Sequence, residues 1–183
     1  MDITTQTNFD NLWSVDRELQ NKAFSFILEA TDKPVDWAYE VWDRLVTGLT
    51  HQDNHVRAIC SQVLANLAKS DPENRMQTDF RALLAVTKDE RFVTARHCMQ
   101  SLWKVGVAGK QQQMQLVDGL DGRFKECISE KNCTLIRYDI IQSLRNLYDT
   151  VGDETIKEIA LALIASEEDL KYRKKYASLW KVK

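Results

Sequence analysis

Two histidines and an aspartate lie close together in the stretch His51–His55 and are the first residues whose types suggest chemistry. Imidazole nitrogens and a carboxylate are ligands that a transition metal accepts, so His51, Asp53 and His55 form a candidate metal site. These residues straddle a predicted helix start and need not share one face of the helix. We therefore expect Asp53 to cap the helix, with metal binding as the alternative.

His97 is followed directly by Cys98, a pair that can act as general base and nucleophile where the two side chains meet. Neighbouring residues of a helix point about 100° apart, so adjacency alone does not bring them together. We expect a buried cysteine beside a histidine at the edge of the core. No CxxC pair occurs, and we expect all four cysteines to be reduced and structural: Cys60, Cys98, Cys127 and Cys133.

The segment Gly106–Lys110 (GVAGK) is similar to the end of a phosphate-binding loop. Lys104 stands where that motif needs its first glycine, and Gln111 stands where it needs Ser or Thr, so we exclude this motif. Neither GxSxG nor HExxH occurs, and no pair of acidic residues is singled out by its spacing. We expect a protein that is not an enzyme, with no catalytic residue, no metal and no cofactor.

The elements that must position any site are predicted to be helices. Of 183 residues, 44% are hydrophobic and 28% charged, but only two are proline and six glycine, too few for the turns of a β-rich fold. The net charge of −2 gives no overall attraction to nucleic acid or to a membrane. We expect a disordered tail over residues 1–8 and a single domain over residues 9–183.

No segment of the sequence predicts a membrane span or a secretory signal. The longest apolar runs, such as Ile159–Ala165, are far shorter than the roughly 20 residues that cross a bilayer. Residues 1–8 (MDITTQTN) are polar and lack both the basic and the apolar region of a signal peptide. We therefore expect a cytoplasmic protein that does not bind a membrane.

A short motif recurs along the chain. Its copies are Gln62–Leu67 (QVLANL), Gln100–Val105 (QSLWKV), Gln142–Leu147 (QSLRNL) and Ser178–Val182 (SLWKV). Their central apolar residues, together with Ile27 at the N-terminal side, are separated by 37, 38, 42 and 35 residues. A period of about 40 residues with two helical segments is typical of arrays in which helix pairs bury their apolar faces by stacking on one another.

Each repeat is predicted to contain two amphipathic helices. Helical spacing is clearest in the second repeat, at Val56, Cys60, Val63, Leu64 and Leu67. The same spacing predicts inward-facing residues in the first repeat at Leu19, Ala23, Phe26, Ile27 and Ala30. Only the short segment Phe9–Trp13 can pair with that helix, so we expect about five pairs, of which the first is incomplete.

Several residues are predicted to start or end these helices. Asp53 precedes one helix, and Ser70 with Glu73 forms a candidate capping box for another. Gly106, Gly109 and Gly152 lie just beyond helical runs, as expected of residues that reverse the chain. The prediction is a series of helices that alternate with short turns.

The sequence resembles HEAT repeats, whose second helix often carries an Asp, a Val-Arg pair and then spaced Ala and Leu. Asp53, Val56, Arg57, Leu64 and Leu67 match that pattern, and Ile136 with Arg137 echoes the Val-Arg pair. The other repeats keep mainly the apolar positions. The resemblance implies an all-α fold in which the pairs form a right-handed superhelix of the armadillo/HEAT type, and it implies binding of macromolecules without inherited chemistry.

The second helix of each pair is expected to line the concave face, the usual binding surface of such arrays. The predicted inward positions are Asn21, Ser25, Glu29, Ala58, Gln62, Asn66, Arg96, Gln100, Lys104, Tyr138, Gln142, Asn146, Arg173, Ala177 and Lys181. Basic character increases along this series toward the C-terminus. We predict a partner-binding ridge at Arg96, Gln100, Lys104, Tyr138, Gln142, Arg173 and Lys181.

Two functions are compatible with this ridge. The first is a scaffold that binds a protein partner along its concave face, favoured by the recurring glutamine and the absence of a catalytic motif. The second is nucleic-acid binding through basic residues interleaved with aromatic ones after Asp169, in the manner of the HEAT-like DNA alkylation-repair glycosylases, which the chain resembles in architecture only. The same basic residues can instead form a solvated end of the last helix.

Overall fold

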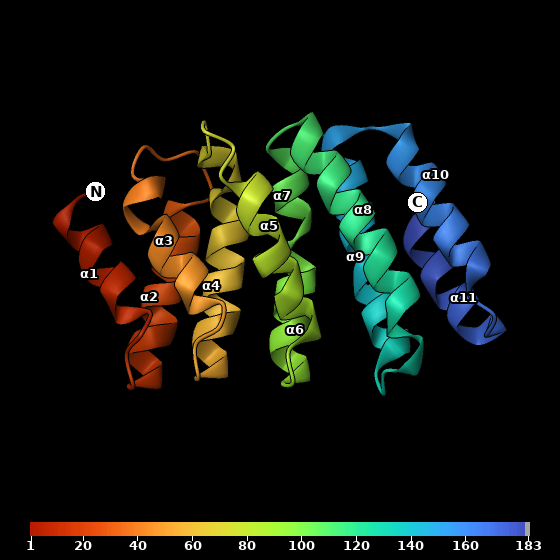
Figure 1. Cartoon of the computed structure of the whole chain (residues 1–183), viewed down its shortest axis with the longest axis horizontal. Helices are drawn as coiled ribbons and strands as arrows, with labels where there is room; N and C mark the ends of the chain where they lie inside the picture. The colour runs from red at the N-terminus through yellow and green to blue at the C-terminus, as the bar shows by residue number, and fades with distance from the viewer. Residues whose placement is uncertain (182–183) are drawn as a thin grey trace. The chain divides into compact units, whose positions relative to one another are not determined.

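The computed structural model describes residues 1–181, and over this range the chain is all-helical, without a strand (Figure 1). This confirms the α class that the sequence predicts. The chain divides into two compact units, Met1–Cys98 and Met99–Lys183, where the sequence predicts one domain. Val182, which ends the fourth copy of the motif, lies outside the described residues. No helix within residues 1–181 combines the length and apolar character needed to cross a membrane.

The first unit is built from helix pairs. Its helices are α1 (Ile3–Asn11), α2 (Arg17–Ala30), α3 (Ala38–Gly48), α4 (Asn54–Leu67), α5 (Met76–Ala85) and the start of α6 (Phe92–Ser101), with short 3-10 turns η1 (Ala68–Ser70) and η2 (Val86–Lys88). Helix α1 packs on α2 and α3 packs on α4, while α2 also contacts α4 and α3 contacts α5 (Figure 1). The helices of this unit therefore alternate between two layers.

The second unit repeats this arrangement. Its helices are α7 (Trp103–Val107), α8 (Lys110–Glu126), α9 (Cys133–Val151), α10 (Glu154–Ser166) and α11 (Leu170–Ala177), with the 3-10 turns η3 (Cys127–Ser129) and η4 (Ser178–Trp180). Helices α8 and α10 contact each other, and α9 contacts α7, α10 and α11. Two layers again result, one holding α8 and α10 and the other holding α7, α9 and α11.

The N-terminal segment differs from its prediction. Residues 3–8, which the sequence assigns to a disordered tail, belong to α1, because Asp2 caps the helix by accepting a hydrogen bond from the backbone nitrogen of Thr5 at 3.0 Å. Thr5 and Phe9 are both buried, and α1 packs along α2. The first pair is therefore complete, since a short helix with few apolar residues is held by packing rather than by its own periodicity.

The apolar registers of α4 and α2 have different outcomes. All five apolar residues predicted to face inward in α4 are at most 2% exposed, which confirms that register. In α2, Leu19 is 40% and Phe26 is 37% exposed, and the buried positions are Gln20, Ala23 and Ile27. Gln20 is buried, and its Nε2 donates to the carbonyl of Leu12 at 2.7 Å. This hydrogen bond satisfies a backbone acceptor at the end of α1, which makes a polar side chain acceptable at a buried position.

The predicted helix boundaries are confirmed only in part. Gly152 ends α9 with φ of 68°, a left-handed conformation that favours glycine. The capping box at Ser70 is wrong, because its hydroxyl accepts from the backbone nitrogen of Val35. The carboxylate of Asp71 instead accepts from the backbone nitrogens of Arg75, the N-cap residue of α5, and of Met76, its first residue. Gly106 lies inside α7 rather than beyond a helix, and a Cβ there would lie 2.9 Å from the side chains of both Leu116 and Leu147.

Candidate functional site

A groove crosses the first unit on the layer formed by α2, α4 and α6. Its volume is about 470 Å³. Ten residues line it: Asn21, Phe24, Asn54, His55, Ala58, Ile59, Gln62, Val93, Thr94 and His97. Three of them, Asn21, Ala58 and Gln62, are among the positions that the sequence predicts on the inner face.

Local structure positions the polar end of this groove. The carboxylate of Asp53 caps α4 by accepting from the backbone nitrogen of His55 at 2.9 Å, as the sequence predicts. That cap places Asn54 in the first turn, where its carbonyl accepts from the hydroxyl of Thr94 at 3.2 Å. Because Thr94 is 1% exposed, this bond fixes the start of α4 against α6.

The groove has a mixed apolar and neutral polar lining. Ile59 is 5% exposed and lies at depth, whereas Val93 is 64% exposed and presents an apolar side chain to solvent. Amide side chains of Asn21 and Gln62 add hydrogen-bond donors and acceptors. None of the ten lining residues is Asp, Glu, Lys or Arg, and the titratable side chains among them are those of His55 and His97.

The residues of the candidate metal site at His51, Asp53 and His55 have structural roles. The carboxylate of Asp53 caps α4 and also accepts from Arg17 at 2.7 Å, while Nδ1 of His51 accepts from the backbone nitrogen of Asp53 at 3.0 Å. Although burial opposes ionisation, the hydrogen bonds from Arg17 and His55 lower the pKa of Asp53. Within residues 1–181 no group of three His, Cys, Asp or Glu side chains is arranged to hold a metal ion.

In the His97 and Cys98 pair, the cysteine is buried, as the sequence predicts, whereas the histidine is exposed rather than at the edge of the core. Cys98 is fully buried, its Sγ lies 3.4 Å from the carbonyl oxygen of Leu83, and burial raises the pKa of its thiol to about 12. His97 is exposed and lines the groove. Burial and a raised pKa both disfavour the thiolate that a cysteine nucleophile requires.

The residues of the predicted ridge make several contacts of their own. Arg96 lies half-buried in α6 within the first unit, and Lys104 in α7 of the second unit has its Nζ 6.0 Å from the ring centre of Trp103. In the second unit, Nε2 of Gln100 donates to Asp139 at 3.3 Å, and Nε2 of Gln142 donates to Asn146 at 2.8 Å. These two glutamines therefore already have hydrogen-bond partners within the fold.

The C-terminal residues of the predicted ridge differ in their surroundings. Nε of Arg173 donates to the carbonyl of Glu167 at 2.6 Å, so this side chain holds the turn before α11. Lys181 is exposed directly after η4. On the neighbouring helix α9, Tyr138 lies beside Lys175, whose Nζ is 4.8 Å from the centre of the ring. The cations of α11 that face solvent are Lys171, Lys174 and Lys175.

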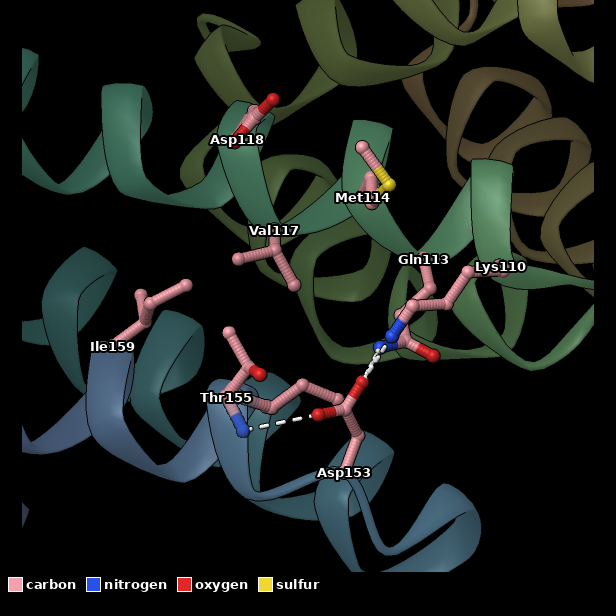
Figure 2. Close-up of a pocket in the computed structure, with 9 residues that line it drawn as sticks. Lys110, Gln113, Met114, Val117, Asp118, Asp153, Thr155 and Ile159 are labelled. Atoms are coloured by element: carbon pink, nitrogen blue, oxygen red, sulfur yellow. Dashed lines mark hydrogen bonds and ion pairs between the residues drawn. The ribbon is translucent and has the colours of Figure 1, made fainter.

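A second, smaller groove runs between α8 and α10, with a volume of about 200 Å³ (Figure 2). Val117 and Ile159 face each other across it, and Met114, which is 60% exposed, adds a flexible apolar side chain. One end is closed by Asp153, which accepts from Lys110 and Gln113. These bonds hold the pKa of its carboxyl far below the usual range. The groove is therefore mostly apolar, with Asp153 at one end and the exposed Asp118 also in its lining (Figure 2).

The comparisons with known proteins concern the fold of this chain. No protein-family model and no curated protein matches this chain. A crystal structure of an engineered protein from the Northeast Structural Genomics Consortium is similar, with 17% identity and a TM-score of 0.57 over 98% of this chain and 78% of that chain. Another engineered protein from the same consortium has 17% identity and a TM-score of 0.50, covering 98% and 88% of the two chains. At this level of identity the likeness concerns the helical fold alone.

Proposed function

We propose that this chain is a non-enzymatic HEAT-like repeat scaffold that binds a segment of a protein partner in the groove formed by α2, α4 and α6. In this proposal the helix pairs stack as a right-handed superhelix of the armadillo/HEAT type, in which second helices form the binding layer. The observation that carries the proposal is the groove itself, because it lies on the second helices and its lining suits a polypeptide.

The chemistry of the lining supports a peptide ligand over a charged small molecule. Peptide backbone needs both donors and acceptors. The amide of Asn21 offers both, and although Nε2 of Gln62 donates to the carbonyl of Ala58 at 3.0 Å, its Oε1 offers an acceptor. Apolar side chains of a ligand can pack on Val93 and Ile59. The absence of charged residues from the lining disfavours a polyanion there. A neutral or mildly apolar segment of a protein is the expected partner.

The test introduces a charge into the groove. Peptides that bind the chain are selected from a phage-displayed random library, and their affinities are measured by fluorescence anisotropy for the wild type and for Val93→Glu. We expect binding at least about tenfold weaker in the variant, because the new carboxylate must be desolvated or must exclude the peptide. Val93 is 64% exposed in the free chain, so this change leaves the core intact.

The matched control is Val15→Glu, which makes the same change at a valine that is 96% exposed and does not line the groove. Its affinity is expected to equal that of the wild type. Selection of no binding peptide, or equal affinity in the Val93→Glu variant and the wild type, would count against this groove as the binding site.

A second candidate function rests on the surface of α11. This helix (LKYRKKYA) has no acidic residue, and its exposed Lys171 and Lys175 lie beside Tyr172 and Tyr138. Lysines can neutralise phosphates while tyrosines stack on bases, which is the chemistry of single-stranded nucleic-acid binding. We therefore keep nucleic-acid binding through α11 as the alternative function.

This alternative is tested with Lys174→Glu combined with Lys175→Glu, which avoids Arg173 because that residue holds the turn before the helix. Fluorescence anisotropy with a labelled single-stranded DNA at low salt is expected to show binding that is at least about tenfold weaker in the variant, with a smaller dependence on salt. The control combines Lys33→Glu with Lys131→Glu, two exposed lysines in other segments. Undetectable binding by the wild type, or an equal loss in the control, contradicts this function.

A further inference from the structure

Two cysteines of the second unit lie in direct contact. Cys127 is the first residue of η3 and Cys133 is the first residue of α9, and their Sγ atoms are 2.9 Å apart. A disulfide places the two sulfurs about 2.05 Å apart, so less than about 1 Å of approach separates this dithiol from a bond. The sequence predicts both residues as structural thiols and gives no sign of this contact.

The contact is held by the backbone of the short segment between the cysteines. The backbone nitrogen of Glu130 donates to the carbonyl of Cys127 at 2.9 Å, and the backbone nitrogen of Cys133 donates to the carbonyl of Glu130 at 3.0 Å. The buried guanidinium of Arg123 also binds both carboxylate oxygens of Glu130, at 2.7 and 2.8 Å. These bonds fold residues 127–133 back on themselves and keep the thiols together in the native chain.

The two sulfurs differ in their access to solvent. Cys127 is fully buried, and its burial, with the neighbouring thiol of Cys133, raises the pKa of Cys127 to about 12, against the opposing effect of Arg137 and Arg123. Cys133 is half-buried. An oxidant from solvent therefore reaches Cys133 first, and Cys127 lies behind it as the second thiol.

We propose that Cys127 and Cys133 form a dithiol modification site, which a small-molecule disulfide such as oxidised glutathione converts into an intramolecular disulfide. Cys60 and Cys98 do not share this property, because they are buried within α4 and α6 and lie outside the 127–133 segment. The native fold supplies what the reaction needs, namely a second thiol already positioned against the first.

The reaction is a pair of thiol–disulfide exchanges. The thiolate of Cys133 attacks one sulfur of oxidised glutathione, the glutathione S–S bond breaks, and one glutathione leaves as a thiolate that takes up a proton. Cys127 then loses its proton and attacks Sγ of Cys133, which expels the second glutathione. Two protein thiols and one glutathione disulfide become one protein disulfide and two glutathione thiols, so the electrons balance without another reactant.

The test exposes the whole chain to glutathione buffers of increasing oxidised fraction, quenches with acid, denatures the protein and alkylates the remaining thiols. Intact mass and peptide mapping are expected to show loss of two alkylated sites and a linked pair of peptides that contain Cys127 and Cys133. Cys60 and Cys98 remain alkylated and serve as internal controls. In Cys127→Ser, the mixed disulfide of Cys133 with glutathione is expected to accumulate, because the second thiol is missing.

The same titration in urea tests whether the disulfide forms readily because of the native fold or only because the two cysteines are close in sequence. The native chain is expected to form the disulfide at a ratio of reduced to oxidised glutathione at least about tenfold higher than the unfolded chain needs, because only the fold holds the two sulfurs in contact. Four alkylated cysteines after oxidation, accumulation of the mixed disulfide in the wild type, or an equal ratio in urea would each overturn the proposal. Circular dichroism of Cys127→Ser confirms that the variant remains folded, and Cys133→Ser supplies a second variant, in which no linked peptide forms.

Discussion

Replacement of Asp89 by alanine is expected to lower the free energy of unfolding by about 3 kcal/mol, because it removes one partner of a nearly buried ion pair. The side chain of Asp89 is 5% exposed and that of Arg57 is 12% exposed. The guanidinium donates to both carboxylate oxygens, from Nε at 2.5 Å and from Nη2 at 2.8 Å. Asp89 also accepts from the backbone nitrogen of Arg91 at 2.8 Å, so the change loosens the start of α6 as well.

The neighbouring residue supplies the matched control for this prediction. Glu90 lies 3.9 Å from the same guanidinium, but its side chain is 84% exposed, so Glu90→Ala is expected to change stability by less than about 0.5 kcal/mol. Both values come from urea unfolding followed by circular dichroism. Equal effects of the two substitutions would show that the pair of Arg57 with Asp89 contributes no more than a surface contact.

The same ion pair makes stability depend on pH. Although burial opposes ionisation, the hydrogen bonds from Arg57 and Arg91 lower the pKa of Asp89 below its value in the unfolded chain. A lowered pKa contributes stability that is present above the unfolded value of about 3.9 and is lost as the pH falls through the folded value. Urea unfolding at a series of pH values is therefore expected to show the wild type losing its advantage over Asp89→Asn below about pH 4.

Replacement of Gly48 by alanine is the second change with a large expected effect, a loss of about 2 kcal/mol. Gly48 is the last residue of α3 and is buried against α4. A Cβ at this position would overlap Sγ of Cys60, a fully buried atom, and would lie 3.5 Å from the ring of Trp13. The helices must move apart to accept the methyl group, and packed interiors resist such movement.

Two further variants isolate the steric cause. Cys60→Ala removes the overlapping sulfur and is expected to lower stability by about 1 kcal/mol alone, while the double variant with Gly48→Ala is expected to lose less than the sum of the two. Gly122→Ala, at a position in α8 where a Cβ meets nothing within 4 Å, is expected to stabilise the chain by about 0.5 kcal/mol. Additive losses in the double variant would exclude the clash as the cause.

The sequence predicts the helices of this chain well where the signal is local. The inward register of α4, its cap at Asp53 and the left-handed glycine that ends α9 are all confirmed. Each depends on residues within a few positions of one another, through apolar spacing, a side chain that accepts from the next turn, or a single backbone conformation. Such signals do not require knowledge of what the helix packs against.

The sequence does not predict features that depend on a hydrogen bond or a packing contact with another segment of the chain. Helix α1 has little apolar periodicity and exists because Phe9 is buried against its neighbours, and Gln20 replaces Leu19 on the inner side of α2 because it satisfies the carbonyl of Leu12. Arg173, predicted as part of a binding ridge, donates to the carbonyl of Glu167, a contact that the sequence does not predict. These outcomes depend on polar groups of other segments that no spacing rule can identify.

The candidate site shows the same division between sequence and tertiary structure. Periodicity alone predicts Asn21, Ala58 and Gln62 on one side of their helices, because helical geometry fixes which residues share a face. The tertiary packing brings α2, α4 and α6 close enough to form a groove that His55 and His97 also line. Periodicity does not predict this, because the distances between helices depend on side chains throughout the unit. The contact of Cys127 with Cys133 has the same origin, because it follows from hydrogen bonds that turn the chain back between η3 and α9.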